Sequence, residues 1–232
     1  MLRSTTETWM KGTAKVISGS LTGDVEVIRL GLQEGGDSNA LLTPHLGESV
    51  LKLGRYGVNF PYFPALHAAI DGGTKQNMEA AFYLANSGAD LNLFKIALFG
   101  DLRNISKEVW MSGRGLGYPP ALLFALGMGR KPTNAHAALL QRLYLSLPDR
   151  FNKSHIQQWV QESGSSPLTH IALTNNFFDG LNVLVTVMGY SVNELDSYGV
   201  STLHVGMIYT FIFPSIDDCV TLICLLPSCL VW

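Results

Sequence analysis

The sequence predicts an all-α fold, a solenoid of stacked helix-turn-helix repeats with long insertions between them. Residues 64–92 hold two apolar helical runs between a Pro-x-Leu-His turn and a Gly-Ala-Asp-x-Asn turn. Residues 166–206 hold the same order of features, with Gly-Tyr-Ser-Val-Asn at the closing turn. His170 and His204 are 34 residues apart, which is one repeat length of a helical repeat protein. Because a single hairpin of this kind cannot bury its apolar side, each copy needs neighbours.

We expect a single repeat domain over residues 1–232. The expected repeats lie near residues 14–39, 64–92, 120–147 and 166–193, with a degenerate last repeat at 199–226. Most of these copies are further apart than one repeat length, so the sequence predicts insertions at 40–63 and 93–119, which are either extra segments or degenerate repeats.

Small residues mark the ends of the predicted helices. A helix that ends in the left-handed conformation favours glycine there, and the glycines in this position are Gly35, Gly88 and Gly189. Asparagine suits the turn that leads out, because it tolerates such backbone angles and bonds to nearby amides. The asparagines in this position are Asn39, Asn92 and Asn193. At the start of a first helix, Ser166 is expected to be the N-cap and Pro167 to lie in the first turn.

Two stretches resemble the ankyrin repeat family: Gly88-Ala89-Asp90-Leu91-Asn92, and the junction Asn193-x-x-Asp196-x-x-Gly199-x-Ser201-x-Leu203-His204. In that family, Asp-x-x-Gly-x-Thr-Pro-Leu-His opens a repeat and Gly-Ala-Asp-x-Asn closes it. The resemblance implies short β-turn fingers and a concave row of first helices that hold a protein partner. It also implies a structural role, bridging turn backbones between repeats, for His67, His170 and His204.

Charge and motif content exclude several classes of function. The chain carries 16 Lys and Arg against 18 Asp and Glu, with no basic run, so a nucleic-acid partner is not expected. The absence of any Gly-Lys dipeptide excludes a phosphate-binding loop, and the common hydrolase and zinc motifs are missing. We therefore expect no enzyme activity, catalytic residue, cofactor, metal site or small-molecule substrate. One alternative is an enzyme whose site lies in the insertions, with Arg55 and Arg114 as anion binders.

The sequence thus predicts a non-enzymatic scaffold that binds a protein partner through its β-turn fingers and concave helix face. Tyr198 is the strongest single candidate for a contact, because Tyr is enriched among the residues that dominate interface energies. The expected partner-binding residues are Ser197, Tyr198 and Val200 in the finger at the junction, Asp71 and Gly72 at the end of one first helix, and Thr174 and Asn175 at the end of another.

We expect an intracellular, cytoplasmic protein. The N-terminal residues lack the apolar core of a secretory signal, and the three cysteines, an odd number, form no disulfide framework. The apolar tail, residues 207–232, leaves three interpretations open: a degenerate last repeat, a membrane-associated segment that anchors the protein, or a truncated or misread end. The apolar stretches on either side of Asp217 and Asp218 are shorter than the ~20 residues that span a bilayer.

Overall fold

A computed structural model describes residues 2–40, 64–93, 120–128, 131–162, 166–196 and 198–206. These residues are mainly helical, as predicted, and they contain no strand apart from one isolated antiparallel bridge between Leu195 and Ser201. The predicted insertions, residues 40–63 and 93–119, lie outside the described residues except for Ala40 and Leu93. The tail at 207–232 also lies outside them.

The first helical pair consists of α1, Leu2–Thr22, and α2, Val25–Gln33. Gly23, in the left-handed conformation at φ +77°, makes the turn between the two helices. Asp24 caps α2, because its Oδ1 accepts the Val27 N–H at 3.1 Å. Helix α1 begins twelve residues before the predicted start of the repeat at residue 14.

The second pair consists of α4, Ala65–Gly72, and α5, Lys75–Asn86. Gly73 ends α4 in the left-handed conformation, and the Thr74 side chain accepts the Asn77 N–H at the start of α5. Both helices lie within residues 64–92.

The third pair begins with a short helix α7, Ala121–Leu123, which continues into the π-helical segment η3, Phe124–Met128. Its second helix is α8, Asn134–Ser146. A 3₁₀ turn η4, Pro148–Arg150, and a further helix α9, Lys153–Glu162, follow before the next pair. The sequence analysis did not predict α9.

The fourth pair consists of α10, Leu168–Thr174, and α11, Phe178–Asn182, which continues into the π-helical segment η5, Val183–Val187. The expectation for the start of α10 was wrong in detail. Pro167, not Ser166, is the N-cap residue, and no side-chain hydrogen bond caps this end. After this pair come the bridge at Leu195 and Ser201 and a helical stretch at residues 202–206.

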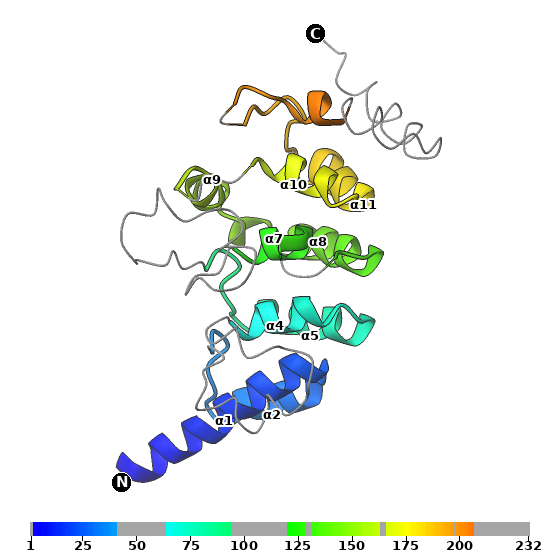
Figure 1. Cartoon of the computed structure of the whole chain (residues 1–232). Coiled ribbons are helices and arrows are strands. Elements are labelled where there is room, and N and C mark those ends of the chain that lie inside the picture. Colours follow the sequence, from blue (N-terminus) through cyan, green and yellow to red (C-terminus); the bar gives the residue numbers. More distant parts are fainter. Residues whose placement is uncertain are drawn as a thin grey trace.

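The four pairs are stacked one on another in chain order (Figure 1), and α9 lies beside the stack. The first helices contact one another along the stack, since α1 packs on α4 and η3 packs on both α4 and α10. The second helices do the same, with α8 packed between α5 and α11. One apolar core therefore runs through all four pairs, and its members include Ile17, Ile28, Leu66, Leu84, Leu123, Leu140, Leu173 and Leu184.

Candidate partner-binding site

Side chains near the starts of the second helices connect each pair to the one before it. The Asn77 amide in α5 donates to the Ser20 and Leu21 carbonyls, at 3.3 and 3.4 Å, in the last turn of α1. His136 Nε2 in α8 lies 3.1 Å from the Ile70 carbonyl near the end of α4. The last carbonyls of a helix lack the usual N–H partner within the helix, and these side chains of the next pair donate to them. The Ile70 carbonyl also accepts the Gly73 N–H at 3.2 Å.

The tautomer of His136 follows from its second contact. Its Nδ1 accepts the Thr133 N–H at 3.1 Å, so the ring proton of the neutral imidazole is on Nε2 and is donated to the Ile70 carbonyl. The third interface uses a different donor for the same purpose. The Asn175 amide, which follows α10, donates to the Leu126 carbonyl of η3 at 2.9 Å.

The closing turns of the pairs repeat one local geometry. In the first, second and fourth pairs, a side-chain oxygen accepts the N–H of the residue two positions further on: Asp37 accepts from Asn39, Asp90 from Asn92 and Ser191 from Asn193. The first two asparagines also reach the next unit, because Asn39 Oδ1 accepts the Asp90 N–H at 2.7 Å and Asn92 Oδ1 accepts the Asn152 N–H at 2.9 Å. Their role is therefore to connect neighbouring turns.

The glycines and the asparagines named in the sequence analysis have different backbone angles in these turns. Gly35, Gly88 and Gly189 have the predicted positive φ, at 80°, 108° and 68°. Among the non-glycine residues that the structure describes, Asn176 alone has a positive φ. Tolerance of left-handed angles, one of the two reasons proposed for the asparagines of the closing turns, therefore does not apply to them.

The junction turn, which we define as residues 194–196 and 198–201, follows the fourth pair. Asp196 organises it, because its Oδ1 accepts the N–H groups of Tyr198 and Val200, both at 2.9 Å. The backbone closes the turn as well, with the Asp196 N–H donating to the Val200 carbonyl and the Gly199 N–H to the Asp196 carbonyl, both at 3.0 Å. Gly199 has φ +74°, which favours glycine at this position.

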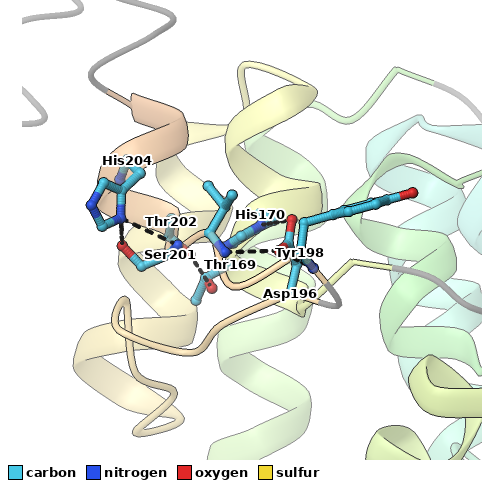
Figure 2. A network of polar contacts seen from close by, with 8 residues as sticks. Thr169, His170, Asp196, Tyr198, Ser201, Thr202 and His204 are labelled. Carbon is cyan, nitrogen blue, oxygen red and sulfur yellow. Dashed lines mark hydrogen bonds and ion pairs between the residues drawn. The ribbon is translucent and has the colours of Figure 1, made fainter.

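His170 holds the junction turn against α10. Its Nδ1 lies 3.9 Å from Asp196 Oδ2, and the side chain is only 2% exposed (Figure 2). A second contact lies nearby, where the hydroxyl groups of Thr169 and Thr202 are 2.6 Å apart and buried. His170 thus connects the turn to α10, and Thr169 connects the same helix to residues 202–206, which follow the turn.

Burial and hydrogen bonding move the pKa values of the acidic and basic groups in this turn. Burial lowers the pKa of His170, and the Asp196 carboxylate and a hydrogen bond to the Glu194 backbone oppose that effect only in part. The N–H groups of Val200 and Tyr198 lower the pKa of Asp196, although partial burial opposes them. Burial raises the pKa of Glu194, against the opposite effect of Lys153.

Tyr198 projects from this fixed turn into solvent. Its side chain points away from His170 and Asp196 (Figure 2), and the residue is 89% exposed. Leu195, on the same turn, is 61% exposed. The sequence analysis did not single out Leu195, which forms the antiparallel bridge with Ser201.

The other predicted contact residues are less accessible. Val200 is half-buried within the junction turn, and Ser197 lies outside the described residues. Asp71 is also half-buried, whereas Gly72 is buried against the Asn77 side chain, which an added Cβ would meet at 2.2 Å.

At the end of α10, Thr174 is exposed, and Asn175 is half-buried by its bond to η3. The predicted residues therefore form separate groups. Tyr198 and Val200 lie on the junction turn, which contacts α10 through His170, whereas Thr174 and Asn175 lie where that helix ends.

A scan against protein-family models finds no match, and a search of curated proteins returns no significant relative. Within the described ranges, no three His, Cys, Asp or Glu side chains lie close enough together to hold a metal ion. None of the described helices combines the length and the apolar character needed to cross a membrane. Arg55 and Arg114, the residues of the enzymatic alternative, lie outside the described residues.

Proposed function

We propose that this protein is an intracellular, cytoplasmic, non-enzymatic scaffold of the ankyrin repeat type, which binds a protein partner chiefly through the junction turn. The observation that carries the proposal is the presentation of Tyr198. An aromatic side chain that is 89% exposed stands on a turn whose backbone is fixed by Asp196 and Gly199. A rigid turn loses little conformational entropy on binding, so more of the contact energy of the ring remains as affinity.

The stack supports the repeat interpretation in three ways. Its helical pairs follow the predicted copies, its glycines after the second helices have positive φ, and its closing turns share one hydrogen-bond pattern. Stacked repeats of this kind present extended surfaces on which a partner can lie. The exposed ring of Tyr198 would fill a pocket on that partner, in the manner of an interface hot spot, and the exposed Leu195 on the same turn would add apolar contact area.

The test is affinity capture from native extract with three forms of the full chain: wild type, Tyr198→Ala and Leu145→Ala. Leu145 on α8 is a suitable control, because it is an apolar residue 64% exposed and lies away from the junction turn. We expect a protein that is retained by the wild type and the control but lost with Tyr198→Ala. Retention of the same proteins by all three forms would refute the assignment to Tyr198.

A further inference from the structure

The contact between His170 and Asp196 joins a buried imidazole to the carboxylate that organises the junction turn. One oxygen of Asp196 faces His170 Nδ1 at 3.9 Å, and the other accepts the Tyr198 and Val200 N–H groups. His170 Nε2 is buried with no hydrogen-bond partner among the described residues. A proton added at Nε2 would therefore be a buried donor without an acceptor, which costs free energy.

We propose that the junction turn is pH-sensitive: protonation of His170 favours release of the turn from α10, so acidification frees the segment that carries Tyr198. The proton comes from solvent and binds Nε2 when the turn opens and water reaches the ring. The carboxylate of Asp196 attracts the imidazolium, but burial is the larger influence on His170. Protons therefore bind the open form more tightly than the closed form, and acid shifts the balance towards the open form.

The charged groups around His170 decide which residues need controls. Among the described elements packed on α10, η3 and η5 carry no titratable side chain, and Asp179 of α11 is exposed. The junction turn contributes Asp196, whose lowered pKa keeps it ionised at mildly acidic pH, and Glu194, whose raised pKa makes it the main competing group. Residues 202–206 contribute the exposed His204, whose Nδ1 lies 2.8 Å from the hydroxyl of Ser201.

Amide hydrogen exchange on the full chain, measured by NMR without any partner, tests the proposal. The protection of each amide at pH 7.5 and at pH 5.5 is obtained by comparing its exchange rate with the intrinsic rate of an unprotected amide at the same pH. With an ordinary His pKa of 6.5 in the open form, linkage limits the loss of protection to about tenfold. We expect a loss of protection, within that limit, at the Tyr198 and Val200 amides in wild type, Glu194→Gln and His204→Gln, and no loss in His170→Gln.

Unchanged protection in the wild type, or an equal loss in His170→Gln, would overturn the proposal. If His170→Gln does not fold, the titration of the His170 imidazole in the wild type, followed by ¹³C NMR, decides instead. A pKa below 6.5 supports the proposal, and a pKa at or above that value refutes it. Only the consequence for binding depends on the proposed function, because this experiment contains no partner and leaves Tyr198 unchanged.

Discussion

Replacement of one leucine at each end of the described stack tests how burial is distributed along it. Leu184, in η5 of the fourth pair, is completely buried, whereas Leu30, in α2 of the first pair, is 42% exposed. The two leucines occupy comparable positions, since each lies on the second helix of its unit. We predict that Leu184→Ala destabilises the protein much more than Leu30→Ala.

The magnitudes follow from what each substitution removes. Leu→Ala deletes three carbon atoms, each worth ~0.8 kcal/mol when buried, and a closed site adds the cost of a cavity. Leu184→Ala should therefore lower the free energy of unfolding by about 2–5 kcal/mol. At Leu30 part of the side chain already contacts water, and water can fill the space left behind, so about 1 kcal/mol is expected.

Urea unfolding followed by far-UV circular dichroism gives the two free energies, with the slope compared between variants to check that the same transition is observed. Because a stacked array can unfold in parts, hydrogen exchange provides a second measurement. We expect stronger protection at residues 180–188 than at 22–34. An equal or larger cost for Leu30→Ala, or stronger protection at 22–34, would refute the reasoning.

Three further predictions concern individual contacts. Gly31→Ala should cost about 1–3 kcal/mol, because its Cβ would lie 2.6 Å from a backbone oxygen of α1. Gly35→Ala, in open space at φ +80°, should cost only about 1 kcal/mol by thermal unfolding. His136→Ala should cost about 2–3 kcal/mol in urea, because it removes the acceptor of the Thr133 N–H and one of the two donors to the Ile70 carbonyl, whereas exposed His155→Ala should be near neutral. Asp196→Ala should remove the exchange protection of the Tyr198 and Val200 amides, whose N–H groups donate to the Asp196 carboxylate. Asp196→Asn, which keeps a side-chain oxygen as acceptor, should largely retain that protection. In His170→Gln, which removes the pH effect proposed for His170, the protection of these amides should persist down to pH 3.8 and weaken only below it, because the pKa of Asp196 is lowered from 3.8.

The helical pairs could be predicted because their signals are local. Apolar periodicity placed each helix, and the positive φ of Gly88 and Gly189 follows from where each helix must end. The position of Tyr198 in a turn could also be predicted from a local signal, because the Asp-x-x-Gly spacing that fixes the turn lies within four residues. The sequence did not reveal the burial of Gly72, which depends on the Asn77 side chain of the next helix.

The contacts between pairs could not be predicted, because they join residues far apart in the chain. His136 and Ile70 are one example. For His170 the family resemblance implied a bridging role towards turn backbones, but it did not indicate the pairing with the Asp196 side chain. A usable signal existed for the first: Thr74-x-x-Asn77 and Thr133-x-x-His136 share one spacing at the start of a second helix. Helix α9 lies between two of the expected repeats and resembles neither of their helices, so a comparison of repeats did not predict it.

The side-chain donors that reach the end of a first helix come from the following pair in all three interfaces of the described stack. Asn77, His136 and Asn175 each satisfy the end of a first helix in the preceding pair. Each first helix therefore acquires its final hydrogen-bond partners only when the following pair is in place. During synthesis from the N-terminus, every pair would leave the ribosome with the end of its first helix incomplete until its successor folds onto it. Shortening the chain from its C-terminus should accordingly weaken the last pair that remains, whereas shortening it from the N-terminus removes no such partner.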